Sequence, residues 1–148
     1  MNSSFKFIFS FGFSVFLAQI SIAQHLASSY HPKNKIEKQV LAKVNDLPEI
    51  KEWLKTAKYS KPDILMNDPD SKSKYYSFQV GLNNLDMFRT NYWLYVDPKN
   101  LEIYYWDQLN IMDNQMITLE QWRHWRTKPG FQKQHIYKNN KLVTIKDK

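Results

Sequence analysis

The sequence predicts an α+β fold: an N-terminal helix or helices packed on a three- to four-stranded antiparallel meander, plus a short C-terminal helix. Three runs of alternating residues between Tyr75 and Trp106, separated by turn signals, indicate the strands. Apolar residues recur at helical spacing from Ile36 to Ala57, which indicates the N-terminal helices. A helix-start signal at Thr118 indicates the C-terminal helix.

The first 23 residues have the order of a secretory signal peptide. A cationic start, Met1–Lys6, precedes the apolar stretch Phe7–Ile22, and Ser21-Ile22-Ala23 places small residues before a cut at Gln24. An uncleaved anchor is the less favoured alternative, because about 16 residues fall short of the roughly 20 that span a bilayer. We therefore expect an exported protein, periplasmic or extracellular, with no membrane span after cleavage. Its sequence has no cysteine, so no disulfide supports the fold.

Residues 24–34 are polar and predict a flexible leader, and a single α+β domain is expected over residues 35–130. The helical repeat starts at Lys35. Pro48 suits the first turn of a helix, and Glu49 suits its positive N-terminal end. The pattern leaves open one helix kinked near Pro48 or two short helices, with one apolar side facing a sheet in either case.

The segment from Tyr59 to Lys74 predicts a loop with at most one short strand, at Ile64-Leu65-Met66. Asn67, Asp68 and Asp70 suggest calcium, but the segment lacks the glycine and the distal glutamate of a calcium-binding loop. A solvated turn is favoured, and no metal site is predicted.

The meander has one apolar face. Its members are Tyr76, Phe78 and Val80 in the first run, Phe88, Tyr92, Leu94 and Val96 in the second, and Leu101, Ile103 and Tyr105 in the third. A type I turn at Asp97-Pro98-Lys99-Asn100 predicts that Val96 faces Leu101, that Leu94 faces Ile103 and that Tyr92 faces Tyr105. Between the first two strands we expect Gly81–Asp86 to form a loop long enough to project toward a partner.

The C-terminal part begins with a capping box formed by Thr118 and Gln121, with Ile117 and Trp122 as its hydrophobic staple. The helix is predicted over Leu119–Arg126, and Pro129-Gly130 ends it. Residues 131–148 predict either a basic C-terminal tail or an added hairpin.

Positive charge is concentrated at the C-terminal end. Arg123–Lys148 holds eight Lys or Arg against one acid, whereas Gln24–Trp122 holds 12 basic and 13 acidic residues. A nucleic-acid-binding face needs its charge clustered on the folded surface, so we do not expect the domain to bind nucleic acid.

The hairpin from Tyr95 to Ile103 resembles those of PepSY-like and cystatin-like modules of secreted bacterial proteins. Those modules often end a strand in Val-Asp, turn through Thr-Gly, and open the next strand with an acid and an Ile or Val. Val96, Asp97, Glu102 and Ile103 fit, whereas Asn100-Leu101 stands where Thr-Gly is usual. The resemblance implies a small exported module that binds or inhibits, with no catalytic residues to carry over.

Catalytic and cofactor motifs are absent from the sequence. After the signal only Gly81 and Gly130 remain, too few for a phosphate-binding loop, and the four histidines have no His or Cys partner at metal spacing. We therefore predict no cofactor, no metal and no enzymatic activity.

The second face of the meander is aromatic where a sheet covered on one side should be polar. The predicted partner-binding residues are Tyr75, Arg89, Trp93, Tyr95, Tyr104 and Trp106, with Trp93 facing Tyr104 and Tyr95 facing Glu102. One interpretation is that the tail or the C-terminal helix covers this face as a second core layer. The other is an exposed surface for a protein, peptide or glycan ligand, or for a second copy of the chain.

The preferred function is therefore non-enzymatic binding or inhibition through the aromatic sheet face. The first alternative is electrostatic binding of an anionic envelope polymer or nucleic acid by the basic C-terminal segment. A small hydrolase is the third.

Overall fold

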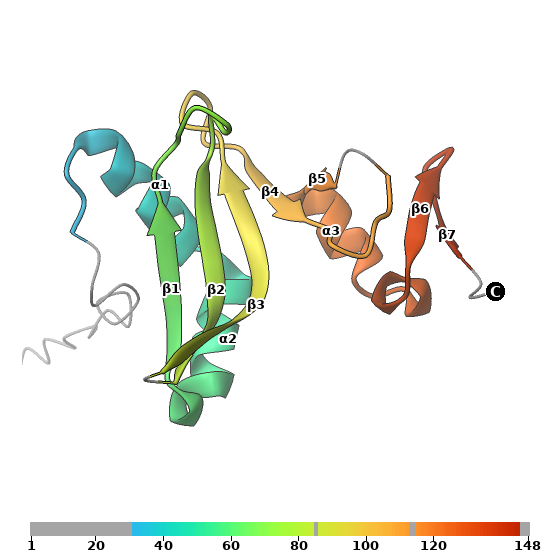
Figure 1. The fold of residues 1–148 in the computed structure, drawn as a ribbon, viewed down its shortest axis with the longest axis horizontal. Coiled ribbons are helices and arrows are strands. Elements are labelled where there is room, and N and C mark those ends of the chain that lie inside the picture. The colour runs from blue at the N-terminus through green and yellow to red at the C-terminus, as the bar shows by residue number, and fades with distance from the viewer. Residues whose placement is uncertain (1–30, 85, 113–114, 146–148) are drawn as a thin grey trace, which may run out of the picture.

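The computed structural model describes residues 31–84, 86–112 and 115–145 of the chain (Figure 1). The predicted signal peptide and most of the predicted leader lie outside these residues. The described part has the α+β architecture expected: a five-stranded antiparallel sheet in the order β1-β2-β3-β4-β5, three α-helices, and a separate two-stranded hairpin, β6-β7.

The helices and strands follow one another simply along the chain. The α-helices are α1 (Lys35–Asn45), α2 (Pro48–Ala57) and α3 (Leu119–Trp125), and two short 3₁₀ turns are η2 (Lys58–Ser60) and η3 (Pro129–Gln132). The strands are β1 (Pro62–Asn67), β2 (Tyr76–Asn84), β3 (Met87–Val96), β4 (Ile103–Trp106), β5 (Met116–Thr118), β6 (His135–Lys138) and β7 (Lys141–Thr144).

The N-terminal repeat forms two helices. The Asn34 side chain caps α1 by accepting the Glu37 backbone N–H at 3.0 Å, and the Glu37 carboxylate accepts the Lys33 backbone N–H in return. Pro48 occupies the first turn of α2, where the N–H that proline lacks would have no helical partner. A break at Asp46-Leu47 therefore separates the two helices.

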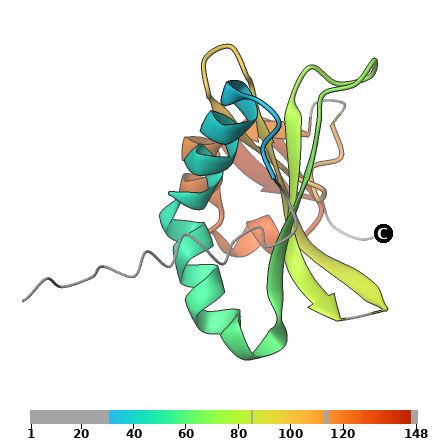
Figure 2. The ribbon, with the colours of Figure 1, turned by 90° about the vertical axis from the view of Figure 1, so that its left-hand side faces the viewer.

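Both helices cover the same face of the β1–β3 sheet (Figure 2). Their buried residues meet the inward side chains of the strands in one aliphatic cluster, which we call the N-terminal core. Its buried members are Val40, Val44, Leu47, Ile50, Ile64, Met66, Tyr76, Phe78, Val80, Leu94, Val96 and Ile103. Among the described residues, no α-helix lies on the opposite face of the β1–β3 sheet (Figure 2).

The β2–β3 hairpin is longer than predicted. Residues 81–84 continue β2 and pair with β3 as far as Met87, so the expected Gly81–Asp86 loop is wrong. The pairing shifts between Val80, which faces Tyr92, and Gly81, which faces Thr90, leaving Asn91 as the extra residue of a β-bulge.

Gly81 makes this bulge possible. A Cβ atom at this position would lie 2.1 Å from the Arg89 carbonyl oxygen and 2.8 Å from the Phe88 ring. Backbone approaches this close accept only glycine.

The turn between β3 and β4 contains two residues more than predicted, Leu101 and Glu102, both on the β4 side. The backbone N–H of Asp97 donates to Glu102 O at 3.0 Å, and Leu101, at φ 58°, donates to Asp97 O at 2.8 Å. Val96 therefore faces Ile103 and Leu94 faces Tyr105, in place of the predicted partners. A shift of two residues keeps every side chain on its predicted face, which is why the core is still apolar.

The outer edge of the sheet is β1. Asn83 donates its N–H to Lys61 O, so residue 61 forms its hydrogen bonds with β2. Because hydrogen-bonding direction alternates along a strand, the N–H and C=O groups of residues 62, 64 and 66 point away from β2. Pro62 has no N–H to offer, and the Ile64 N–H donates to the Asp63 carboxylate at 2.8 Å. Two of these three outward positions therefore present no free donor.

The C-terminal elements build a second, aromatic cluster, which we call the C-terminal core. The predicted capping box at Thr118 and Gln121 is confirmed, and α3 ends at Trp125 with Arg126 as its cap. Met116–Thr118 forms an additional strand, so the sheet has five strands. Ile117, Trp122 and Phe131 form the buried centre, and Tyr105 stacks on Trp122 with ring centroids 4.8 Å apart.

Residues 131–145 join this core through η3 and the β6-β7 hairpin, the second of the two predicted alternatives for the tail. A bidentate ion pair from Arg123 to Glu49, at 2.7 and 3.0 Å, also ties α3 to α2. Within the described ranges, no helix has the length and apolar character needed to cross a membrane.

Candidate functional site

The aromatic residues predicted for the second sheet face lie together. Tyr95 is at the centre: its ring centroid is 5.3 Å from that of Trp106 and 6.5 Å from that of Tyr75, and Tyr75 is 5.6 Å from Tyr104. Strand pairing explains the cluster, because Tyr95 faces Tyr104 directly, where Glu102 was predicted. We call Tyr75, Trp93, Tyr95, Tyr104 and Trp106 the aromatic face.

Trp93 lies on the same face one pair further along the sheet. On β2 it is opposite Gln79. The predicted pairing of Trp93 with Tyr104 on β4 is wrong, because the longer turn pairs Tyr104 with Tyr95. Gln79 in turn accepts a hydrogen bond from the Thr90 hydroxyl at 3.1 Å. A large indole therefore adjoins a neutral pair of hydrogen-bonding side chains.

The aromatic face is separate from both cores. None of its five members belongs to the N-terminal or the C-terminal core, and α3 packs on the opposite side of β4, against Tyr105. Tyr95 is only 9% exposed because its aromatic neighbours cover it, whereas Tyr75, Trp93, Tyr104 and Trp106 are half-buried. Among the described residues, the predicted cover by the C-terminal helix is not formed.

Polar groups at one end fix the orientation of the rings. The Tyr104 hydroxyl donates to the Glu102 carboxylate at 2.7 Å, and this bond raises the pKa of Tyr104 to about 12. The Lys74 ammonium lies 3.2 Å from the Asp97 carboxylate and 4.8 Å from the centre of the Tyr75 ring. The bond to Asp97 raises the pKa of Lys74, so the ammonium remains charged over the ring.

Arg89 does not belong to this face, which corrects the prediction. Arg89 pairs with Leu82 and Phe88 pairs with Asn83, because the extra residue at Asn91 inverts the alternation of the strand before it. Arg89 is therefore on the helix side, and Phe88 moves to the side of the aromatic face. The side of the sheet on which Arg89 and Phe88 lie depends on the backbone conformation at Gly81 and Asn91, which the hydrophobic pattern does not reveal.

A second constellation was not predicted from the sequence. Asp107, directly after β4, and His135, at the start of β6, are almost fully buried, at 1% and 0% exposed. His135 Nε2 is 2.8 Å from Asp107 Oδ2, and the Tyr137 hydroxyl donates to the same oxygen at 2.5 Å. Burial, followed by the bond to Asp107, raises the pKa of Tyr137 well above its usual value, so the phenol remains a donor.

The histidine in this constellation has both ring nitrogens occupied. Nδ1 lies 2.7 Å from the Lys133 carbonyl oxygen and Nε2 lies 2.8 Å from the Asp107 carboxylate, so both nitrogens have a partner within the protein. Catalysis by a histidine requires a nitrogen that reaches a substrate. We conclude that Asp107, His135 and Tyr137 attach the hairpin to the sheet. The sequence does not reveal this role, because Asp107 and His135 are 28 residues apart in the chain.

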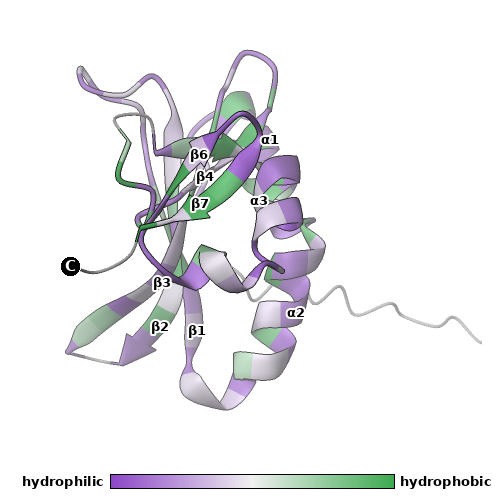
Figure 3. Ribbon diagram, turned by 90° about the vertical axis from the view of Figure 1, so that its right-hand side faces the viewer, coloured by the Kyte–Doolittle hydropathy of each residue, from purple (hydrophilic) through white to green (hydrophobic). Residues whose placement is uncertain are grey.

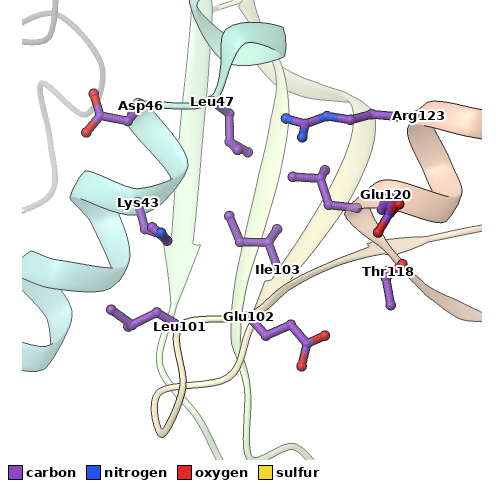
Figure 4. Close-up of a pocket in the computed structure, with 10 residues that line it drawn as sticks. Lys43, Asp46, Leu47, Leu101, Glu102, Ile103, Thr118, Glu120 and Arg123 are labelled. Carbon is purple, nitrogen blue, oxygen red and sulfur yellow. The ribbon is translucent and has the colours of Figure 1, made fainter.

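A groove of about 500 Å³ lies on the helix side, between α1, the break that follows it, β4 and α3 (Figure 4). Its apolar floor is surrounded by charges of both signs. The lining residues are Lys43, Asp46, Leu47, Leu101, Glu102, Ile103, Thr118, Leu119, Glu120 and Arg123. Arg123 is committed to Glu49 and Asp46 to Lys51, so the groove offers a ligand no concentrated charge.

Across residues 31–84, 86–112 and 115–145, the His, Asp and Glu side chains form no group of three that could hold a metal ion. The arrangement on the aromatic face instead favours non-covalent contact with planar or extended ligands. No protein-family model matches this sequence, and neither the curated proteins nor the solved structures include a match to it.

Proposed function

We propose that this protein is an exported, non-enzymatic binding module whose ligand lies on the aromatic face. The observation that carries the proposal is the separation of five large aromatic side chains from both hydrophobic cores. A sheet that is covered by helices on one face normally presents polar residues on the other, so an aromatic surface at this place supports a ligand-binding role.

The chemistry of the face suits an extended peptide or a glycan. Aromatic rings contribute large contact areas at low entropy cost, and the surrounding amide, hydroxyl and carboxylate groups of Gln79, Thr90 and Glu102 supply directional bonds. A second copy of the protein, bound through the same face, is the other partner that suits this surface.

The resemblance to PepSY-like and cystatin-like modules supports the same proposal. Those modules usually have a glycine in the β3–β4 turn, and Leu101 occupies that position with φ 58°, a conformation that favours glycine. The backbone of the turn is thus compatible with the resemblance although its residue differs.

The test is Trp93→Ala, with Tyr59→Ala as the matched control because Tyr59 is 88% exposed and lies outside the face. Binding to peptide and glycan arrays, and self-association by analytical ultracentrifugation, would be compared for both variants. We expect Trp93→Ala to weaken the interaction by about 2 kcal/mol or more with little change in melting temperature. If Trp93→Ala instead costs about 3 to 5 kcal/mol of folding stability and leaves binding intact, the residue is structural and the proposal fails.

A further inference from the structure

The C-terminal hairpin has an outer face that neither core uses. The loop segment 109–111 pairs alongside β6, because Ile111 donates its N–H to His135 O at 3.1 Å and His135 donates to Leu109 O at 3.0 Å. With β7 on the other side of β6, these segments form a small three-stranded surface at one end of the molecule.

Alternation divides this surface into two sides. Asn110 and His135 are buried on the inner side, and Leu142 and Thr144 point the same way, toward Gly130. The neighbouring residues therefore point outward. The outward apolar residues, together with Met112 at the end of the segment, are Leu109, Ile111, Met112, Ile136, Val143 and Ile145; we call them the outer stripe.

The outer stripe is exposed to a degree that is unusual for aliphatic residues. Ile111 is 55% exposed and Val143 is 43% exposed. Figure 3 looks onto this end of the molecule and shows hydrophobic colouring on β7. The buried network of Asp107, His135 and Tyr137 holds this surface in place from behind.

The charge beside the stripe identifies the class of partner. Lys138 and Lys141 face each other at the turn of the hairpin, and both are exposed. Two copies apposed through this face would bring like charges together. A soluble polyanion would satisfy the lysines but leave the aliphatic side chains in water.

We infer that the outer stripe is a docking site for an anionic lipid bilayer. The aliphatic side chains enter the boundary between headgroups and acyl chains, and Lys138 and Lys141 remain at the level of the anionic headgroups. This attachment leaves the aromatic face, on the sheet, free for a ligand, so the inference goes beyond the proposed function and does not depend on it.

Vesicle sedimentation tests this inference. The protein would be prepared from Gln24 onward, which removes the apolar residues 7–22 and none of the described helices and strands. It would be mixed with phosphatidylcholine vesicles with or without phosphatidylglycerol. We expect binding to vesicles that contain phosphatidylglycerol, a loss of about tenfold or more in Ile111→Ser/Val143→Ser, and a similar loss in Lys138→Gln/Lys141→Gln.

The matched control is Ile36→Ser, because Ile36 is 46% exposed on α1, remote from the hairpin in sequence, and should leave vesicle binding unchanged. Circular dichroism would establish that each variant is folded. Binding that high salt abolishes but Ile111→Ser/Val143→Ser does not affect would mean a purely electrostatic contact and would overturn the inference. Absence of binding to either vesicle, or self-association that the serine substitutions abolish, would also overturn it.

Discussion

The two cores of this protein contain different kinds of side chain. The N-terminal core joins α1 and α2 to long strands through aliphatic side chains such as Val44, Ile50 and Leu94. The C-terminal core joins a seven-residue helix to four-residue strands through stacked aromatic rings and the buried pair of Asp107 and His135. Among the described residues, three of the five buried polar or charged side chains, Asp107, Asn110 and His135, lie in the C-terminal part.

The difference shows how element length decides what stabilises a region. Long amphipathic elements bury enough apolar area for non-directional packing to specify their arrangement. Short elements bury less, and buried hydrogen bonds then contribute the geometric specificity, at the cost of a large penalty when one partner is lost. Tyr92 and Tyr105 contact both cores and connect the two kinds of packing.

The largest effect should come from ending the chain after Lys128. This truncation removes Phe131, Tyr137 and Leu142 from the C-terminal core and leaves the Asp107 carboxylate without His135. We expect the C-terminal core to lose more than about 5 kcal/mol and to unfold. Near-ultraviolet circular dichroism should report loss of the Tyr105–Trp122 stack, while a cooperative melting transition of the N-terminal core remains. A single loss of all structure would mean that the two cores form one cooperative unit.

Phe78→Ala probes the aliphatic side of the comparison. Phe78 is fully buried in the N-terminal core, so its truncation should destabilise the protein by about 3 to 5 kcal/mol in equilibrium urea unfolding. Met87→Ala is the control, because Met87 is exposed and its truncation should change stability by no more than about 0.5 kcal/mol. Similar losses of stability for both substitutions would show that packing around Phe78 does not stabilise the N-terminal core more than an exposed side chain does.

Asp107→Asn probes the polar side. The substitution removes the buried carboxylate that His135 Nε2 and the Tyr137 hydroxyl both contact, and we expect it to cost about 3 kcal/mol of stability. Hydrogen exchange at the His135 and Ile111 amides should accelerate more than exchange in β2. Tyr137→Phe retains the contact between Asp107 and His135 and should cost only about 1 kcal/mol. Equal costs for the two variants would mean that the contact between Asp107 and His135 adds no stability beyond the hydrogen bond from Tyr137.

The smallest effect should come from the contact between α2 and α3. The Arg123 guanidinium lowers the pKa of the Glu49 carboxyl below 4.5, so the contribution is complete above pH 4.5 and is lost as the pH falls through the depressed pKa. We expect Arg123→Ala to cost about 1 kcal/mol or less at neutral pH. A double-mutant cycle with Glu49→Gln would isolate the coupling energy, which should vanish in acid. A pH-independent cost would assign the effect to packing.

The parts of the fold that depend on neighbouring residues could be predicted from the sequence. The capping box of α3 spans four residues, and the alternation that assigns Leu94, Val96 and Ile103 to one face needs only the local pattern. The aromatic face was predictable for the same reason: a register error of two residues leaves each side chain on its face.

The remaining features depend on backbone geometry or on distant partners. The bulge at Asn91 arises from a close backbone approach that Gly81 permits, and it moved Arg89 to the other face. The turn closes through Leu101 in a left-handed conformation that favours glycine, so the residue type at this position does not reveal the longer turn. The Asp107–His135 pair forms only after β4 and β6 have been brought together by tertiary packing.

The edge of the sheet at β1 has a consequence for behaviour at high concentration. An exposed strand edge serves as a template on which a strand from another molecule can add, and repeated addition leads to fibrils. Pro62 has no N–H, and the Ile64 N–H already donates to Asp63, so two of the three outward positions on β1 offer no donor to an added strand. The molecule can therefore carry an aromatic face and an aliphatic stripe on its surface while its sheet resists polymerisation from the β1 side.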